Sequence, residues 1–305
     1  MASTMAAPVA NSISLAQKYL PLLDEVYKNE SKTAMLDFAS ERVQFIGANV
    51  AKIAKIDVDG LGNYGRNTGF VPGSADITWE TLTLERDRAR SFNLDVMDND
   101  ETLGLLVGST LGEFERCQVV PELDSYRLAK YAAGAGTTVT ATLSASDDVA
   151  ALIQTAEATL DDKEVPEEGR ILFVNPSIYA LFKGDITRYT ENGDPNVNGN
   201  VEMYDNMRIV KVPSARFNTS ITLNAPTDAS STGGYTAAGV DINFMIVHPS
   251  AVVQIVKHLA PRLFSPEQVF DADAWRLNYR VYHDCFVLAN KTYGIYVHKK
   301  ANAST

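Results

Sequence analysis

The sequence has few of the residues from which metal centres and disulfide scaffolds are built. Its 305 residues include only two cysteines, Cys117 and Cys285, and four histidines. One disulfide could join the cysteines, but reduced thiols are favoured because no cysteine framework surrounds them. None of the four histidines is spaced from a cysteine or an acidic residue as metal ligands usually are. They are His248, His258, His283 and His298. We therefore expect no metal centre.

Long apolar runs and a basic excess are also missing. No run reaches the roughly 18 apolar residues of a membrane span, and residues 1–10 lack the basic and apolar parts of a secretory signal. Lysine and arginine number 27 against 38 aspartate and glutamate, a net charge of −11. Because sequence-independent DNA binding rests on lysine and arginine, the chain is not expected to bind nucleic acid tightly. The net negative charge is explained by solubility, and it is also compatible with a protein that lies near DNA without binding it.

One motif resembles a cofactor site. Residues 60–65, GLGNYG, match the G-x-G-x-x-G pattern of dinucleotide-binding proteins. That site needs a strand before the glycines and a helix after them, yet residues 66–73 contain Pro72 and two glycines and cannot begin a helix. No G-x-S-x-G motif or P-loop is present. We expect a flexible hairpin tip, no cofactor, no catalytic residue and no enzyme.

The segment around that tip predicts a projecting arm. Residues 52–57 form a weak strand pattern, residues 60–73 are rich in glycine, and residues 78–90 are extended and charged. A long two-stranded arm buries little of its own surface and is marginal alone in water. Such an arm needs a neighbouring molecule to cover it, which favours an assembly subunit over an enzyme.

Three arginines of this arm, Arg86, Arg88 and Arg90, fall on one face at period two. Two interpretations stay open: a solvated charged edge, or a strip that forms ion pairs with a neighbouring subunit. We also expect Arg66 at the tip and Trp79 on its strand to contact a neighbour.

From Asp98 the hydrophobic period changes to that of a helix. Apolar residues recur every three or four positions as far as Val120, and the stripe continues to Gly134. Pro121 should kink or restart the helix. Roughly 35 helical residues would span on the order of 50 Å, which predicts a spine for an elongated subunit.

The rest of the chain, from residue 137 onward, mixes strands and helices, so the fold class is α+β. We expect strands at residues 137–144, 170–174, 207–212 and 241–247, and helices at 147–162 and 178–183. A helix is also expected at 251–259, because Pro249 can open one. Residues 218–239 are small and polar, which predicts an exposed loop. A strand over 276–288 should return through 295–298 and pack on the long helix.

Two segments then resemble a known family. Residues 82–98, LTLERDRARSFNLDVMD, and residues 114–129, FERCQVVPELDSYRLA, are similar to major capsid proteins of tailed bacteriophages, which have the Hong Kong 97-type (HK97-like) fold. The likeness in letters covers about the first 135 residues. It implies an N-terminal arm (1–46), an extended loop (47–96), a peripheral domain with the spine helix (97–136 and 259–305) and an axial α/β domain (137–258).

The resemblance also implies a function. Such subunits form hexamers and pentamers that close an icosahedral shell around double-stranded DNA, as part of a virion assembled in the bacterial cytoplasm. Only about 46 residues precede the loop, so any scaffolding protein is expected to be separate; portal and decoration proteins are further expected partners. Lys52 and Lys55 lie at the base of the loop and not at its tip, so no covalent crosslink is carried over.

Two structural alternatives stay open beside this interpretation. An encapsulin-like nanocompartment shares the fold but encloses cargo enzymes instead of DNA. A phage tail or decoration protein is disfavoured by the order of arm and spine.

Overall fold

The structure is a computed structural model that describes residues 31–37, 44–45, 50–67, 69–97, 105–144, 146–189, 201–225, 233–259, 261–269 and 273–302. The expectations for most of the N-terminal arm and for the beginning of the spine helix at 98–104 fall outside these residues. No helix in the described ranges is long and apolar enough to cross a membrane.

One body of the molecule is a seven-stranded sheet. Its path runs from β5 (Thr137–Thr140) through β14 (Ile295–Lys299), β10 (Tyr235–Val247), β6 (Ile171–Val174) and β8 (Met207–Lys211) to β7 (Met203–Tyr204), and β9 (Asn218–Leu223) pairs with β10. Helices α5 (Val149–Asp161) and α6 (Pro176–Tyr189) pack against this sheet. Asp148 begins α5 by accepting a hydrogen bond from the Ala151 amide at 2.9 Å.

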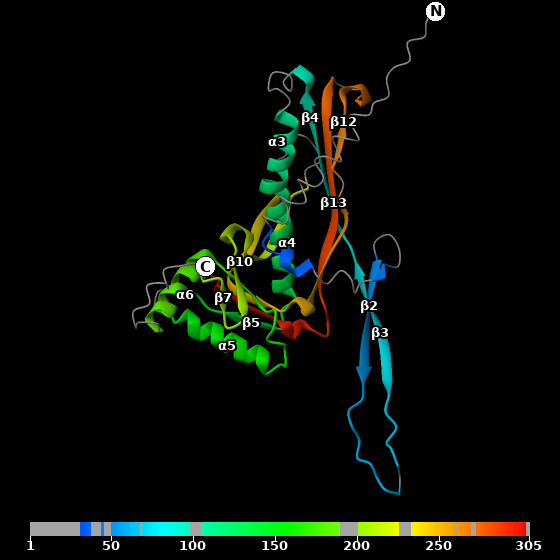
Figure 1. Cartoon of the computed structure of the whole chain (residues 1–305), viewed down its shortest axis with the longest axis vertical. Coiled ribbons are helices and arrows are strands. Elements are labelled where there is room, and N and C mark those ends of the chain that lie inside the picture. The colour runs from blue at the N-terminus through cyan, green and yellow to red at the C-terminus, as the bar shows by residue number, and fades with distance from the viewer. Residues whose placement is uncertain are drawn as a thin grey trace, which may run out of the picture.

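A second, narrower sheet stands beside the long helix. Its centre is β13 (Ala274–Val287), which pairs with β11 (Val252–Leu259) and β12 (Arg262–Phe264) on one side and with β4 (Arg86–Asp95) on the other. Helical residues 105–133 run along the sheet (Figure 1), and we call them the spine helix. Leu111, Val119 and Leu123 pack there on Leu277 and Tyr279.

The spine helix changes winding in its middle. It consists of α3 (Leu105–Phe114), a π-helical segment (Glu115–Val119) and α4 (Val120–Ala133). The Val120 amide donates to the Glu115 carbonyl, five residues back. This wider turn accommodates Pro121, which has no N–H and lies in the first turn of α4. The predicted restart at Pro121 is thus confirmed, and the helical path continues through it.

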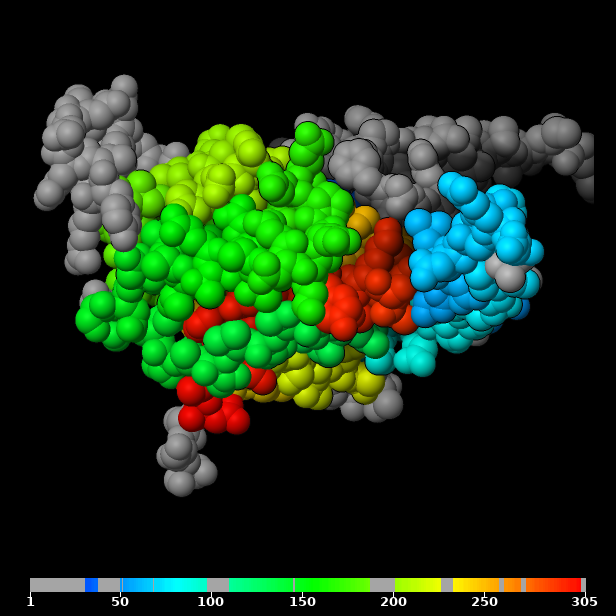
Figure 2. All heavy atoms as spheres, turned by 90° about the horizontal axis from the view of Figure 1, so that it is seen from below, coloured from blue at the N-terminus to red at the C-terminus, as the bar shows by residue number. Residues whose placement is uncertain are grey.

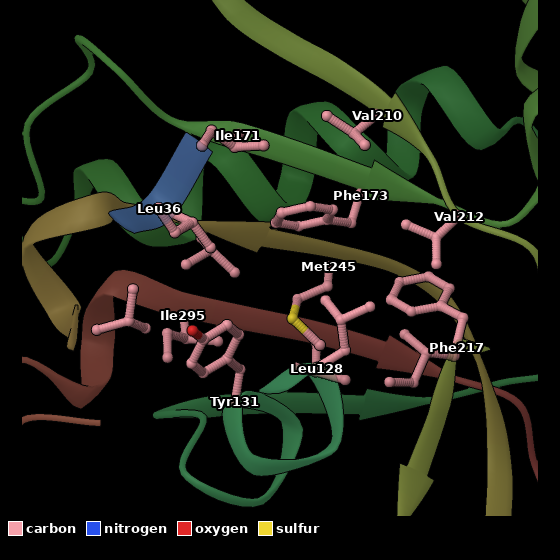
Figure 3. Close-up of a cluster of buried hydrophobic side chains, with 14 of the residues drawn as sticks. Leu36, Leu128, Tyr131, Ile171, Phe173, Val210, Val212, Phe217, Met245 and Ile295 are labelled. Atoms are coloured by element: carbon pink, nitrogen blue, oxygen red, sulfur yellow. The ribbon is translucent and has the colours of Figure 1, made fainter. Parts of the chain in front are cut away.

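The seven-stranded sheet buries apolar residues on both faces, as Figure 3 shows for the side toward α4. There, Leu128 and Tyr131 of α4 meet Phe173, Met245 and residues of the neighbouring strands, and Leu36 covers one end of the cluster. On the other face, Ile153 and Leu160 of α5 and Phe182 of α6 pack on the sheet. The core therefore fixes α4 to the seven-stranded sheet. The N-terminal half of the spine helix packs instead on the narrower sheet around β13.

A third sheet forms the projecting hairpin. It contains β1 (Gln44–Phe45), β2 (Val50–Val58) and β3 (Ala75–Thr83) in that order. In Figure 1 the hairpin extends well beyond the two bodies, and in Figure 2 it forms a separate blue and cyan lobe beside the red and orange C-terminal strands. The projecting part is shorter than the expected loop, because β4 leaves the hairpin and pairs with β13.

Four of the expectations for the second half need correction. Residues 252–259 form β11 and not a helix, because Val252, Val253, Ile255 and Val256 are β-branched and pair with β13. The expected loop at 218–239 contains β9 and the beginning of β10, which pair in an antiparallel ladder.

The other two concern helix length and strand pairing. Helix α6 continues through Gly184 to Tyr189, because α6 packs on the sheet through Phe182 and Ile186. Strand β14 forms as expected but pairs with β10 and β5 instead of returning beside β13.

Candidate subunit interface

The hairpin carries a row of apolar side chains on one face. Ile56 lies directly opposite Ile77, Ala54 opposite Trp79, and Val58 opposite Ala75. The large side chains of this row are 52–67% exposed: Ile56, Val58, Ile77 and Trp79. Cross-strand apolar pairs stabilise a ribbon only modestly, and large apolar groups in a contiguous exposed row indicate a contact surface. We call this row the apolar ribbon face.

The tip of the hairpin is equally open. Gly65 and Gly69 pair across a turn in which Gly69 has a φ of 78°, a conformation that favours glycine. Tyr64 and Phe70 pack on each other with ring centroids 5.0 Å apart, yet Phe70 is 89% exposed. Arg66 is exposed in the same turn. In the described residues 66–67 and 69–95 no helix occurs, so the helix that the cofactor motif requires is not found there.

The base of the hairpin is fixed to the body. Leu82 and Leu84 are buried against Val253 and Ile255 of β11. The Tyr282 hydroxyl donates to the Leu84 carbonyl at 2.8 Å. The hairpin is therefore held at its root, while the large side chains of the apolar ribbon face and of the tip stay more than half exposed.

The arginines of β4 face the spine helix. Arg88 binds Glu122 through both carboxylate oxygens, at 2.7 Å from Nε and 3.1 Å from Nη2. It also donates to the carbonyls of Asn224 and Gly234, at 2.8 and 3.1 Å. The Arg88 and Glu122 side chains are 22% and 14% exposed. All of these partners of Arg88 lie within its own chain.

Arg86 is held by an aromatic partner. Its Nε donates to the Tyr126 hydroxyl at 3.1 Å, which raises the pKa of the arginine, and the guanidinium lies 5.4 Å from the ring centroid. Tyr126 in turn donates to Asp284 at 2.8 Å, and burial raises the pKa of the tyrosine. Arg90 lies opposite Tyr279 of β13 and is half-buried. The structure brings the three arginines together on one face, places Arg66 in the tip of the hairpin and places Trp79 in the middle of the β2–β3 ladder.

Sequence reasoning missed a buried carboxylate that holds the N-terminal segment. Asp124 of the spine helix accepts from the Ser31 and Thr33 hydroxyls at 2.8 and 2.7 Å and from the Lys32 amide at 2.8 Å. Arg216 approaches the same carboxylate at 3.7 Å. The sequence offers one signal for this contact, a single aspartate within an apolar helical stripe. That signal does not predict which residues bind the carboxylate.

Charged and aromatic side chains line a cleft of about 490 Å³ between β4, the spine helix and β13. The Arg88–Glu122 ion pair lies there together with Phe92, Phe114 and Tyr279. His283 also lines this cleft; burial and three nearby arginines lower its pKa to about 3. No group of three or more histidine, cysteine or acidic residues in the described ranges could hold a metal ion.

Comparison of the sequence with known proteins finds no match, whereas comparison of the structure finds several. No protein-family model and no curated protein sequence matches the chain. Among solved structures, the capsid structure of the cyanophage P-SCSP1u matches with a TM-score of 0.60 and 15% identity, over 85% of this chain and 86% of that one. The mature capsid of bacteriophage PhiM1 matches with a TM-score of 0.59 and 16% identity, over 84% and 83%.

A virus-like particle from Pyrococcus furiosus matches as well. Its TM-score is 0.53 at 11% identity, and the match covers 93% of this chain and 99% of that one. At such identities the likeness establishes the fold and leaves the role to be argued. The chain therefore has the fold of these capsid structures, the Hong Kong 97-type fold that its two sequence segments imply.

Proposed function

We propose that this chain is the structural subunit of a bacteriophage head, a major capsid protein that assembles with copies of itself into hexamers and pentamers of an icosahedral shell. The observation that carries the proposal is the projecting hairpin, which exposes its apolar ribbon face while its base is fixed to the body. Such a face is stable in water when a partner covers it. The similarity to capsid structures over most of the chain supports a second copy as that partner.

The two-part body supports a division into domains. We assign the hairpin and its approach to the extended loop, and the spine helix with β4, β11, β12 and β13 to the peripheral domain. The axial domain contains the seven-stranded sheet with α5 and α6. Strand pairing favours placing β14 in the axial domain and β11 in the peripheral one, which moves both boundaries from those expected from the sequence.

Arg66 and Trp79 are the residues that we assign to contacts between subunits. Both are exposed on the hairpin, Arg66 in its tip and Trp79 in the middle of the β2–β3 ladder. The intramolecular partners of Arg86 and Arg88 favour an internal role for these two residues. For Arg90 a contact with a neighbouring subunit stays a prediction.

The role is structural, so we propose no reaction and no cofactor. The shell would enclose double-stranded DNA without binding a particular sequence, in keeping with the net charge of −11. Assembly would take place in the bacterial cytoplasm, with separate scaffolding, portal and decoration proteins as partners. Each contact can be weak, because closure of a shell makes the contacts multivalent.

A nanocompartment is the second candidate. The match to the archaeal virus-like particle over 93% of this chain favours keeping it. The two functions differ in their contents, so nuclease-protected DNA inside particles purified from infected cells supports the phage head, and enclosed protein cargo supports the nanocompartment.

The proposal is tested by expressing the full-length chain and following particle formation by electron microscopy and sedimentation. Replacing Ile77 and Trp79 by serine together should abolish particles and leave the thermal transition of the subunit unchanged, because both side chains are exposed. Thr78→Ser, on the opposite face of the same strand, is the matched control. A compact monomer at every concentration, with the hairpin exchanging its amide hydrogens equally fast throughout, overturns the proposal.

A further inference from the structure

The narrow sheet has a hollow of about 390 Å³ on the face that is turned away from the spine helix. Tyr279 packs on the spine helix, so its neighbours on β13, Asn278 and Arg280, point to the opposite face. Ser91 of β4 and Arg262 of β12 lie on that face too, because each pairs directly with Asn278. We call the site the arginine hollow, and the side chains that form it are Ala89, Ser91, Arg262, Asn278 and Arg280.

The arginine hollow presents mainly hydrogen-bond donors. The Ser91 hydroxyl donates to Asn278 Oδ1 at 2.6 Å, which leaves the amide N–H groups of Asn278 to donate. Arg262 is exposed, and its guanidinium makes no hydrogen bond or ion pair in the described part of the chain. Arg280 binds Asp87 but keeps further N–H groups and is 57% exposed. Donors of this kind bind the oxygens of an anionic group.

The charges around the arginine hollow favour an anion with two negative charges. Arg276 lies on the same face, two positions before Asn278 on β13. Together with Arg262 and Arg280 it brings three positive charges against the single negative charge of Asp87. This excess stands out in a chain whose net charge is −11.

The hairpin carries two carboxylates with the matching arrangement. Asp57 of β2 and Asp76 of β3 lie directly opposite each other in the ladder, and both are exposed. Like charges in such a position destabilise a ribbon, and neither side chain makes a hydrogen bond or an ion pair in the described part of the chain. Lys55 is only a diagonal neighbour of Asp76. The two carboxylates lack the cation that would offset their repulsion.

The spacing of the two sets of charges agrees. Side chains directly opposite each other have Cβ atoms about 5 Å apart, and diagonal neighbours about 7–8 Å. Asp57 and Asp76 are directly opposite, whereas Arg262 and Arg280 are diagonal, since Arg262 pairs with Asn278. The longer arginine side chains can converge on the two carboxylates across the roughly 10 Å between stacked sheets.

The two surfaces cannot meet within one copy. Strand β12 lies at the end of the narrow sheet away from the hairpin (Figure 1), and the base of the hairpin is fixed to the body. A second copy is therefore the source of the carboxylates that the observations favour.

We propose that the arginine hollow of one copy binds Asp57 and Asp76 in the hairpin of a second copy. This contact rests on the proposed function and deepens it, because it names a surface that receives the hairpin. Asp57 and Asp76 alternate with Ile56 and Ile77, so they lie on the side of the ribbon opposite the apolar ribbon face. The hairpin is then covered on both sides in the assembly, by ion pairs on one and by apolar contacts on the other.

The test is a double-mutant cycle on the full-length chain, read as the lowest protein concentration at which particles form. The variants are Asp57→Asn with Asp76→Asn, Arg262→Gln, and all three changes together. Asparagine keeps the size of aspartate and removes the repulsion within the ribbon, so the hairpin stays folded. We expect the hairpin variant and Arg262→Gln each to raise that concentration about tenfold, as loss of a close ion pair between proteins does.

The combined variant decides whether the two surfaces touch. All three changes together should also raise the concentration about tenfold, whereas independent sites would multiply to about a hundredfold. Arg208→Gln removes the same charge from an exposed arginine of β8 and is the matched control, which should assemble as the unmodified chain does.

Three outcomes overturn the contact while leaving the proposed function in place. They are an unchanged concentration for Arg262→Gln, multiplied effects in the combined variant, and normal assembly of Arg262→Gln with weaker retention of a double-stranded oligonucleotide. The last would assign the arginine hollow to DNA phosphates. An unmodified chain that forms no particles overturns the proposed function, and the contact with it.

Discussion

Arg88 of β4 and Glu122 of the spine helix form a bidentate ion pair, with Nε 2.7 Å from Oε1 and Nη2 3.1 Å from Oε2. The pair connects the narrow sheet to the helix next to the π-helical segment. Since Arg88 also donates to two carbonyl groups on the β9–β10 side, one side chain joins three elements of the fold.

The first prediction follows from that contact. Arg88→Glu places two carboxylates together where both side chains are mostly buried, so we expect the subunit to lose about 2–4 kcal/mol of its unfolding free energy. Chemical denaturation of the monomer measures the loss. Arg116→Glu is the matched control, because its ion pair with Glu113 is exposed and such pairs contribute about 0–1 kcal/mol.

The charge swap Arg88→Glu with Glu122→Arg should recover part of the stability. If the single Arg88→Glu variant unfolds at the same denaturant concentration as the unmodified subunit but fails to assemble, the arginine acts between subunits and the internal role is wrong.

The second prediction concerns the N-terminal segment on the spine helix. Asp124→Ala removes the acceptor of three short hydrogen bonds from residues 31–33 and leaves their polar groups unpaired. We expect residues 31–37 to lose most of their protection from hydrogen exchange, with a global destabilisation of about 1–3 kcal/mol. Asp162→Ala, at the exposed end of α5, should change neither. Unchanged protection in residues 31–37 would show that the apolar contacts of Leu36 suffice.

The third prediction compares two glycines, Gly112 within the spine helix and Gly136 shortly after its end. A Cβ on Gly136 would lie 2.7 Å from the Thr292 carbonyl oxygen and 2.8 Å from the Tyr293 Cα, and backbone atoms cannot move aside easily. Gly136→Ala should therefore destabilise the subunit by about 1–3 kcal/mol. Gly112, within α3, has nothing near its Cβ position, so Gly112→Ala should stabilise by about 0.5–1 kcal/mol. Thermal unfolding of both variants distinguishes the two signs, and equal shifts contradict the argument.

How far the sequence predicts the molecule depends on the range of the interactions involved. The spine helix and the hairpin follow from local signals: an apolar stripe with the helical period, and glycines between two extended runs. At residues 251–259 Pro249 predicts a helix start, whereas the β-branched residues of β11 and the ladder to β13 decide the outcome. A local rule fails where a long-range ladder competes with it.

The same distinction applies to the candidate interface. The alternation in residues 86–90 predicts that three arginines share a face, and they do. It cannot say that Glu122, more than thirty positions away, lies opposite Arg88. Asp124 is similar, because its partners at residues 31–33 are distant in sequence. Trp79 is 52% exposed, as expected of a hairpin that leaves the body, and its contact with a neighbouring subunit stays a prediction.

The last prediction concerns acid sensitivity and rests on His283. Burial, with help from Arg127, Arg86 and Arg88, lowers the pKa of this histidine from 6.5 to about 3, so the folded chain keeps it neutral while the unfolded chain protonates it near pH 6.5. Because the folded pKa is depressed, the stabilisation is fully present above pH 6.5 and is lost as the pH falls toward 3. One pKa unit corresponds to about 1.4 kcal/mol, which predicts a loss of roughly 2–4 kcal/mol between pH 6.5 and pH 4.

His283→Phe should flatten this dependence, since phenylalanine keeps the ring beside Tyr126, whose centroid lies 5.6 Å away, and cannot be protonated. The measurement is urea denaturation from pH 4 to pH 8 in the Glu157→Gln background. That background is needed because the raised pKa of Glu157 has the opposite effect, with stability lost as the pH rises from 4.5 through about 7. Parallel curves for the phenylalanine variant and its parent would mean that carboxylate protonation alone governs acid unfolding.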